Sequence, residues 1–356
     1  MADDREADPQ LAAPSWTGQV ASRPCTGPGG GSLHLITDDR LDPSKLEPVQ
    51  LSPVAPPFPV TSPYRVVPAP RPLDGPHVLL DDAWPASVRR RVERLAGDLD
   101  GVVVRDSQSP DDAGLAAALR AAWQLLPLPV MGDLVAVPLL GVEVDLGTAT
   151  ATRTGPTADE SATALVLGCS GLDLLVVGWL LACSDDLVVL RRSGPGTLRA
   201  ELLAVAFPSG WSPRQRAGAS LLDLHAPVAD GERLQRAAPA LSEALLTKGP
   251  YGQHVWGLDP SGRLDRDPSA PDAERPAQPE PSGWWLRVER QTTLPLPGLD
   301  RALFTIRPFL VPLTALDPYR RRTLHDALAS MSPEALRYKG ILDVSPDLLA
   351  WLARPS

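Results

Sequence analysis

Residues 284–292 combine the alternation of a β-strand with charged side chains on both of its faces. One face would carry Trp285, Arg287, Glu289 and Gln291, and the other Leu286, Val288 and Arg290. The first set is typical of a solvated strand face. Arg290 departs from this pattern because it shares the apolar side. A guanidinium that points inward needs a paired charge or a polar ligand. The segment therefore predicts either a ligand site or a structural Arg–Glu pair.

His225 is the second candidate for chemistry. The five histidines contain no pair spaced three or four residues apart, which excludes a zinc site built locally on one helix. His225 lies between Leu224 and Ala226, and Pro227 follows, so its imidazole is held within an apolar segment. Two interpretations stay open: a core histidine with a satisfied hydrogen bond, or an axial ligand of haem iron, which binds neutral imidazole in apolar surroundings.

Several other kinds of site and partner are excluded or not expected. The sequence has no H-E-x-x-H, G-x-S-x-G or Walker A motif, and no G-x-G-x-x-G after a strand. Cys25, Cys169 and Cys183 are widely spaced, which excludes a disulfide framework, a zinc ribbon and an iron–sulfur cluster held by this chain alone. The net charge of −9 and the absence of a basic stripe make nucleic acid an unexpected partner.

The sequence indicates neither a signal peptide nor a membrane-spanning segment. Residues 1–8 are acidic and precede no apolar signal-peptide core. The most apolar run, residues 172–183, is shorter than the roughly 20 residues that span a bilayer. We therefore expect no membrane association and a cytoplasmic location.

Proline and glycine content indicates how the chain is organised, since 41 prolines and 28 glycines stand among 356 residues. Residues 1–55 lack a sustained apolar period and predict a disordered, proline-rich N-terminal tail. The prolines between 53 and 72 indicate extended chain lying on a surface, with Phe58 and Tyr64 as its anchors. Residues 56–356 are expected to form one domain, with a loosely ordered low-complexity insertion at 258–283.

Apolar periodicity and capping signals predict an α+β fold. Helices are expected over 84–95, 111–126, 163–182 with a break near 168–171, 234–246, 319–330 and 346–352. Asp111 or Asp112 is the expected N-cap of the second helix. Strands are expected over 187–190, 198–207, 284–293 and 302–313, with a hairpin turn at 193–197. Helices mixed with antiparallel strand pairs, without β-α-β alternation, define this class.

Four segments, in order along the chain, resemble the alpha-subunit family of haem-dependent oxidative N-demethylases, to which large subunits of dimethylamine monooxygenases belong. They are Tyr64-Arg65 with Arg71-Pro72-Leu73-Asp74, then Phe207-Pro208-Ser209-Gly210-Trp211, then Leu224-His225-Ala226-Pro227-Val228, then Leu286–Thr292 with Leu303–Arg307. The C-terminal Met331-Ser332-Pro333-Glu334 and Tyr338-Lys339-Gly340 also resemble the family's ending. The resemblance runs from about residue 55 to the end of the chain.

The resemblance implies a PAS-like antiparallel sheet flanked by helices, with haem b and its iron as cofactor. It implies a monooxygenase reaction in which dioxygen removes a methyl group from a small secondary amine and formaldehyde is released. The chain has no flavin or nicotinamide fingerprint and no cluster cysteines, so electrons would come from a separate flavin/iron–sulfur reductase subunit. The expected partners are therefore the amine, dioxygen and this reductase.

The resemblance also assigns roles to particular residues. His225 would be the iron ligand, Glu289 and Arg290 catalytic residues, and Arg287, Trp211 and Trp256 cofactor contacts. An arginine would pair bidentately with a haem propionate, and Glu289 would hold a substrate ammonium or orient a water. Which of Arg287, Glu289 and Arg290 does which of these jobs is left open.

Two segments depart from the family pattern. Gln253-His254-Val255-Trp256 stands where the family shows Arg-x-Asn-Trp, and Cys183-Ser184-Asp185-Asp186 stands where Gln-Glu-Asp is usual. The loss of a cation and an amide near a pocket puts the substrate, the haem affinity and the activity in question. His254 is a further candidate for a second iron ligand. The alternatives to an enzyme are a non-catalytic, haem-binding PAS-like sensor and a haem-free relative that acts as an interaction scaffold.

Overall fold

The computed structural model of the protein describes residues 51–65, 70–109, 111–220, 223–224, 231–270 and 279–354, without the side chains of 231–235. Residues 1–50 of the predicted tail and the candidate ligand His225 lie outside the described residues.

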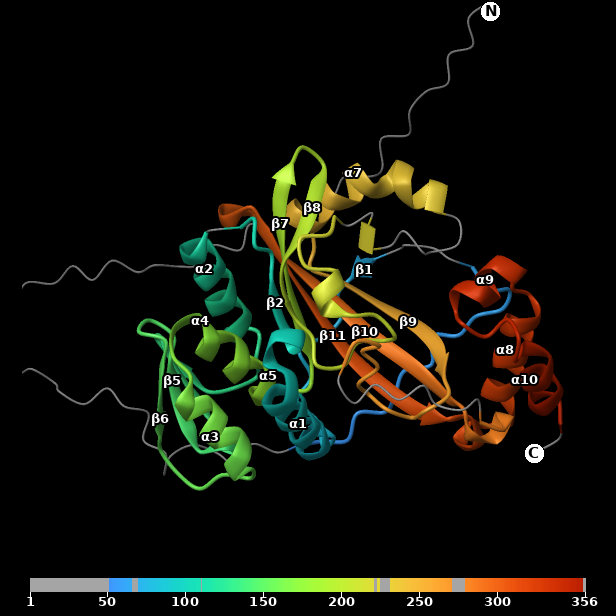
Figure 1. Cartoon of the computed structure of the whole chain (residues 1–356), viewed down its shortest axis with the longest axis horizontal. Helices are drawn as coiled ribbons and strands as arrows, with labels where there is room; N and C mark the ends of the chain where they lie inside the picture. Colours follow the sequence, from blue (N-terminus) through green and yellow to red (C-terminus); the bar gives the residue numbers. More distant parts are fainter. Residues whose placement is uncertain are drawn as a thin grey trace, which may run out of the picture. The chain divides into compact units, whose positions relative to one another are not determined.

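A seven-stranded antiparallel sheet carries the segment singled out above (Figure 1). Its strands lie in the order β1 (Arg71–Pro72), β9 (Tyr251–Asp259), β10 (Trp285–Leu296), β11 (Arg301–Pro312), β7 (Asp186–Gly194), β8 (Thr197–Ala204) and β2 (Val103–Arg105). The pair β10–β11 is the longest, and its register runs from Trp285 opposite Pro312 to Leu296 opposite Arg301. The predicted strand pairs 187–190 with 198–207 and 284–293 with 302–313 are confirmed as β7–β8 and β10–β11.

A second, four-stranded antiparallel sheet was not predicted. It consists of β3 (Val130–Met131), β4 (Leu134–Val137), β5 (Val142–Asp145) and β6 (Thr150–Arg153). Strands of two to four residues show too few alternations to be recognised from hydropathy alone. The sheet is nevertheless well packed, since Val135, Val137, Val142 and Val144 are all buried.

The helices complete an α+β fold, as predicted. They are α1 (Trp84–Val102), α2 (Asp112–Trp123), α3 (Glu160–Gly168), α4 (Gly171–Asp173), α5 (Trp179–Ala182), α7 (Gly231–Thr247), α8 (Pro318–Ala329), α9 (Pro333–Tyr338) and α10 (Ser345–Leu352). Short 3₁₀ turns lie at Pro138–Leu140, Pro213–Gln215, Pro281–Gly283, Pro297–Leu299 and Leu313–Ala315. The predicted cap of α2 is confirmed, since the Asp111 carboxylate accepts a hydrogen bond from Gly114 N at 2.9 Å. The predicted break near 168–171 is also present, and a π-helical turn (Leu174–Gly178) joins α4 to α5.

The large sheet has two faces with different coverings. We name them after adjacent residues of β10, the Glu289 face and the Arg290 face. On the Arg290 face, Leu187, Val189 and Leu303 pack in one apolar cluster with α1, α2 and α5. Farther along that face, Leu286, Val288 and Phe309 pack in a second cluster with α8, α9 and α10. The Glu289 face is covered by a smaller third cluster, in which Val188 and Leu203 pack with Leu245 and Leu246 of α7.

The extended N-terminal segment lies where the sequence predicted. Phe58 and Tyr64 both pack against the second cluster, which confirms them as anchors. The Tyr64 ring meets Trp256 edge-on, with ring centroids 5.8 Å apart and planes at 85°. Burial, with the charge of Tyr338 as a smaller cause, raises the pKa of Tyr64 to about 12.

The predicted insertion at 258–283 differs from the expectation in its first half. Residues 259–270 form a packed loop in which Asp259 and Asp267 are 1% and 4% exposed. The Asp259 carboxylate accepts from Ser261 N and Gly262 N and pairs with Arg266 at 3.0 Å. The mixed acidic and basic composition thus organises this loop through its own pairs, which composition alone does not show. Residues 271–278 lie outside the described residues.

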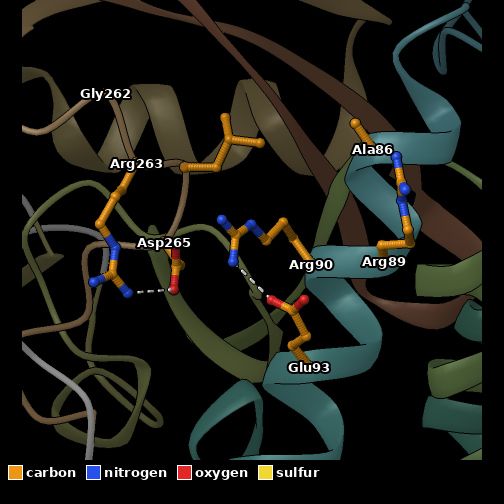
Figure 2. A pocket seen from close by; sticks show the side chains of 8 residues that line it. Ala86, Arg89, Arg90, Glu93, Gly262, Arg263 and Asp265 are labelled. Carbon is orange, nitrogen blue, oxygen red and sulfur yellow. Dashed lines mark hydrogen bonds and ion pairs between the residues drawn. The ribbon is translucent and has the colours of Figure 1, made fainter.

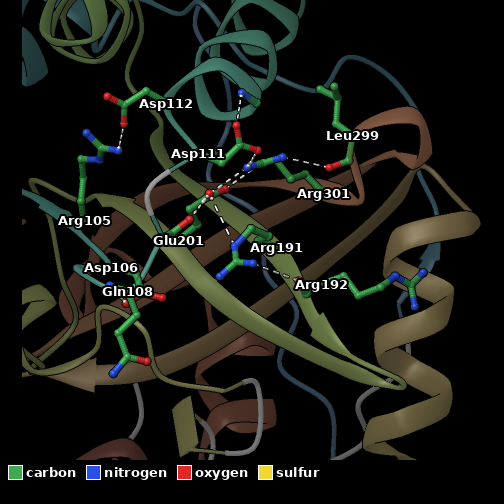
Figure 3. A network of polar contacts seen from close by, with 12 residues as sticks. Arg105, Asp106, Gln108, Asp111, Asp112, Arg191, Arg192, Glu201, Leu299 and Arg301 are labelled. Carbon is green, nitrogen blue, oxygen red and sulfur yellow. Dashed lines mark hydrogen bonds and ion pairs between the residues drawn. The ribbon is translucent and has the colours of Figure 1, made fainter.

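A buried ion pair joins three of these elements (Figure 3). Arg301 at the start of β11 is 4% exposed, and Glu201 of β8 is 2% exposed. Two parallel hydrogen bonds connect them, Nε to Oε2 at 2.6 Å and Nη2 to Oε1 at 2.8 Å. Arg301 also pairs with the α2 cap Asp111 at 2.9 Å, and Ser109 Oγ donates to Glu201 at 2.6 Å. The network therefore fixes the start of α2 to the sheet.

Removing one partner of this pair should strongly destabilise the protein. We expect Arg301→Ala to lower the free energy of unfolding by about 3 kcal/mol, because the buried Glu201 carboxylate loses both of its hydrogen bonds from Arg301 and keeps as a counter-charge only Arg191, whose Nε lies 3.6 Å away. Urea unfolding measures this change. Arg153→Ala is the matched control, since Arg153 and Glu160 also form a two-bond pair but are 43% and 72% exposed. Equal losses for the two variants would contradict the account.

Candidate functional site

A chain of hydrogen-bonded polar side chains crosses the Glu289 face. Arg287 Nε donates to Ser209 Oγ at 2.5 Å, and the Ser209 hydroxyl donates to Glu289 Oε1. From the other side, Gln291 Nε2 donates to Glu289 Oε2 at 3.0 Å, and Gln253 Nε2 donates to Gln291 Oε1 at 2.8 Å. The Glu289 carboxylate therefore accepts hydrogen bonds from both of its neighbours in the chain of contacts, Ser209 and Gln291. We call these five residues the Glu289 row.

Arg287 holds the Glu289 row in place through its hydrogen bonds. It is 5% exposed, and its guanidinium donates to Phe207 O at 2.7 Å and Leu264 O at 2.9 Å, in addition to Ser209. Burial lowers the pKa of Arg287, and the nearby Glu289 charge opposes that change. With these bonds and a further one to Arg263 O at 3.2 Å, it ties two loops to β10. Few of its N–H groups remain to bind a haem propionate.

Arg290 lies on the opposite face, as the sequence predicted from its place among apolar residues. It is 9% exposed, and its guanidinium donates to His77 O at 2.8 Å and to Pro76 O. Burial lowers the pKa of Arg290, and the charge of Asp185 opposes this. Its partners are thus backbone carbonyls rather than the glutamate of an Arg–Glu pair. The structure brings Arg287 and Glu289 together and places Arg290 apart from them.

The two candidate tryptophans are also separated. Trp211 is half-buried and packs against the third cluster, on the Glu289 face. Trp256 packs against the second cluster, on the Arg290 face, where it stands opposite Val288 in the β9–β10 register. Its ring lies 4.5 Å from Lys339 Nζ. Only Trp211 of this pair is therefore on the same face as Glu289.

Leu224, the last described residue before His225, has apolar surroundings. Leu224, which precedes His225, packs against the third cluster together with Trp211 and Phe304. Thr293, opposite Phe304 in the sheet, is 5% exposed, and its hydroxyl has no hydrogen-bond partner among the described residues. The third apolar cluster therefore extends to the residue before His225. The described part of the chain forms no cluster of three or more His, Cys, Asp or Glu side chains that would hold a metal ion.

His254 points away from these residues. It lies directly opposite Arg290 in the β9–β10 register, and so on the Arg290 face. Its side chain is exposed, and partial burial together with the Arg290 charge lowers the pKa of its imidazole. A second iron ligand at His254 would therefore be separated by the sheet from the cluster that contains Leu224.

Asp185 is a candidate functional residue to which the sequence analysis gave no role. It is fully buried, and neither carboxylate oxygen has a hydrogen-bond partner among the described residues. Desolvation raises the pKa of Asp185 to about 7, against the opposing charges of Arg307, Arg290 and Arg91. Arg307 already pairs with Asp81, and Arg91 with Asp186. The sequence pointed to Asp185 only through the departure of residues 183–186 from the family's Gln-Glu-Asp pattern.

A hollow of about 400 Å³ lies elsewhere, between α1 and the loop at 262–265 (Figure 2). Two ion pairs lie among its charged side chains, Arg90 with Glu93 at 2.8 Å and Arg263 with Asp265 at 3.1 Å, and Arg89 Nε donates to Pro85 O. None of the residues that line it belongs to the Glu289 row. We therefore place the candidate site at Glu289 and not in this hollow.

The fold and site define an α+β protein whose antiparallel sheet presents a hydrogen-bonded carboxylate on one face. The chain belongs to a known family: the model for the haem-dependent oxidative N-demethylase, alpha subunit-like family matches residues 172–349. The match includes the Glu289 row and Asp185, and confirms the family resemblance. It does not extend to the segments around Tyr64 and Arg71. Within the described residues, no helix has the length and apolar character required to cross a membrane.

The ionisation of Asp185 should make stability depend on pH. Because its pKa is about 7 in the folded protein and about 4 in an unfolded chain, the folded state binds more protons between these values. The free energy of unfolding should therefore decrease as the pH rises from about 4 to 7, by roughly 4 kcal/mol, and then level off.

Asp185→Asn should remove this decrease, since an amide does not titrate. Urea unfolding of wild type and variant at pH 5 and pH 8 provides the comparison, with Asp82→Asn as the control because Asp82 is exposed. A pH dependence that Asp185→Asn leaves unchanged would rule out this role for the carboxyl.

Proposed function

We propose that the protein is a haem-dependent monooxygenase that binds a small secondary amine at Glu289 and removes one methyl group as formaldehyde. The observation that carries this proposal is the Glu289 carboxylate, which Ser209 and Gln291 hold in one orientation within the region that matches the family. A fixed carboxylate is a suitable counter-ion for a substituted ammonium. The antiparallel sheet with helices on both faces supports a PAS-like arrangement for the cofactor.

His225 is the proposed iron ligand, and Trp211 is proposed to contact the haem, because Leu224 and Trp211 share the apolar cluster of the Glu289 face. When bound, haem supplies the activation of dioxygen, and the protein supplies the ligand and the position of the amine. Arg290 would act from the opposite face, by fixing the segment at Pro76 and His77 to β10. Trp256 has an equally indirect role, because it packs against Tyr64 and Lys339.

The amine would be oriented by the Glu289 row. The Glu289 carboxylate binds the substrate N–H groups and accepts a proton from the ammonium, while Arg287 and Ser209 prevent its rotation. The overall reaction takes the secondary amine, dioxygen, two electrons and two protons to the demethylated amine, formaldehyde and water. We propose that the electrons come from a separate flavin/iron–sulfur reductase, in agreement with the alpha-subunit character of the family.

One observation favours a second candidate, a haem-binding protein that does not turn over amines. Gln253 stands where the family pattern has an arginine, and its neutral amide bonds to Gln291. The row therefore lacks a cation that its relatives carry at this point. A sensor that responds to a gas or to redox state would keep the haem without needing the amine at Glu289.

Two variants separate the roles in this proposal. Protein purified with haem supplied should show a Soret band, and His225→Ala should shift or abolish it. Glu289→Gln should keep the band but lower kcat/KM for dimethylamine about 10- to 100-fold with a surrogate reductase, because it removes a charged hydrogen-bond partner of the amine.

Glu280→Gln is the control for the second variant, since Glu280 is exposed and belongs to no part of the row. Folded wild type without a Soret band would exclude both haem functions and leave the interaction scaffold. A Soret band with no amine turnover would favour the sensor.

A further inference from the structure

Residues 71–82, which we call the strap, lie on the Arg290 face of the large sheet and are attached at both ends. At the first end, strand β1 pairs with β9. At the other end, Val78 is fully buried in the first apolar cluster, and the Asp81 carboxylate pairs with Arg307 at 2.7 Å. Residues 74–76, between these two attachments, are exposed.

Arg290 holds the middle of the strap. Its guanidinium donates to Pro76 O and His77 O, and Thr292 Oγ1 makes a longer hydrogen bond of 3.4 Å to His77 O. Within the described part of the chain, residues 74–77 make no other hydrogen bond to the sheet. Both acceptors of Arg290 are neutral carbonyls, so a carboxylate would be a stronger partner for this guanidinium.

An unpartnered carboxyl lies in the same row across the sheet. Arg290 stands directly opposite Arg307 in the β10–β11 register. The last pair between β11 and β7 is Ile306 with Asp186, so the next residue of β11, Arg307, lies beside Asp185. Alternation along β7 places the Asp185 side chain on the Arg290 face. Asp185 is fully buried, and neither of its carboxylate oxygens has a hydrogen-bond partner among the described residues.

The charge of Asp185 decides how favourable this row is. Arg290 and Arg307 are like charges in directly opposite positions, which is unfavourable in a sheet. Desolvation raises the pKa of Asp185 to about 7, against the opposing charges of Arg307, Arg290 and Arg91. Arg307 already has the Asp81 carboxylate as its partner, whereas Arg290 binds only carbonyls. Arg290 is therefore the cation that gains most by turning to an ionised Asp185.

The other titratable groups near this row do not account for a change of charge around pH 7. They are His77 and Asp81 of the strap, Arg91 of α1, Cys183 and Asp186 beside Asp185, and His254 of β9. Burial, with the Arg290 charge as a smaller cause, lowers the pKa of both imidazoles below its ordinary value of about 6.5. Burial raises the pKa of the Cys183 thiol, which therefore stays protonated. Asp186 is bonded to Arg91 and to two backbone N–H groups, which oppose the effect of its burial.

We propose that Asp185 and the strap compete for Arg290, so that the middle of the strap is held when Asp185 is protonated and released when Asp185 is ionised. On ionisation, Arg290 exchanges its two carbonyl partners for a charge-assisted bond to the Asp185 carboxylate. Residues 74–77 then leave the sheet, while both ends of the strap stay attached. The strap is therefore held in mildly acidic solution and released in mildly alkaline solution. This inference does not depend on haem or on the amine.

Hydrogen–deuterium exchange of the full chain at pH 6 and pH 8.5 tests this switch, with mass spectrometry of peptides that span residues 73–79. Each exchange rate is divided by the intrinsic rate of an unprotected chain at the same pH. Protection of these peptides should be about tenfold lower at pH 8.5, the factor expected from the loss of one hydrogen bond to a charged group. Peptides from β11 should keep their protection, because the release is confined to the strap.

Three variants assign the change to its residues. Asp185→Asn should keep the protection seen at pH 6 at both pH values, since an amide does not ionise. Asp82→Asn should behave like wild type, because Asp82 is an exposed carboxyl of the same segment. Arg290→Ala should give low protection at both pH values, because residues 76 and 77 have lost their main donor.

Wild-type protection of residues 73–79 that is equal at pH 6 and pH 8.5 would overturn the inference. So would an equal pH dependence in Asp185→Asn, which would assign the change to the histidines. An equal loss of protection in β11 would also contradict it, because the whole sheet would then be opening. The comparison of Asp185→Asn with Asp82→Asn decides the question even if Arg290→Ala does not fold.

Discussion

The hydrogen bonds of Arg287 are the constraint on which the candidate site depends. Arg287 lies near the start of β10, and its guanidinium binds the backbone of two loops, at Phe207 and Leu264, that come from different parts of the chain. The first of these loops supplies Ser209, and Ser209 in turn holds Glu289. Without this arginine, the carbonyls of the two loops would lose their hydrogen-bond donor, and the Glu289 carboxylate would lose its orientation. The hydrogen bonds that Arg287 donates therefore determine where the residues of the candidate site lie.

The alternation of β10 divides the charged residues of the family motif between two faces with different roles. Glu289 lies on the face that α7 covers only in part, where the residue preceding the proposed iron ligand also packs. Arg290 lies among helices and binds the Pro76–His77 backbone, in the region that contains the unpartnered Asp185 carboxyl. The first face carries the carboxylate at which we propose that the amine binds, whereas the second contains the groups whose burial is expected to make stability depend on pH.

The sequence alone predicted those elements whose pattern repeats over neighbouring residues. Twelve residues of alternation in β10 and β11 predicted the strand pair and the inward direction of Arg290, and the Asp111 cap predicted the start of α2. It was insufficient where partners lie far apart, since Ser209 and Arg287 are separated by 78 residues and Arg290 and His77 by 213. Strand β9 was missed because Gly252, Gln253, His254 and Gly257 give it neither an apolar alternation nor β-propensity. Its position nevertheless decides that Val255 lies opposite Glu289.

The central claim is that the Glu289 face of the sheet is the functional face. A crystal structure of the full chain, grown with haem and dimethylammonium, tests it most directly. The account predicts haem density on the face that carries Glu289 and the third apolar cluster, with the iron bonded to His225 and the amine nitrogen within hydrogen-bonding distance of the Glu289 carboxylate. Haem or amine density on the opposite face, beside Arg290 and Asp185, would contradict it.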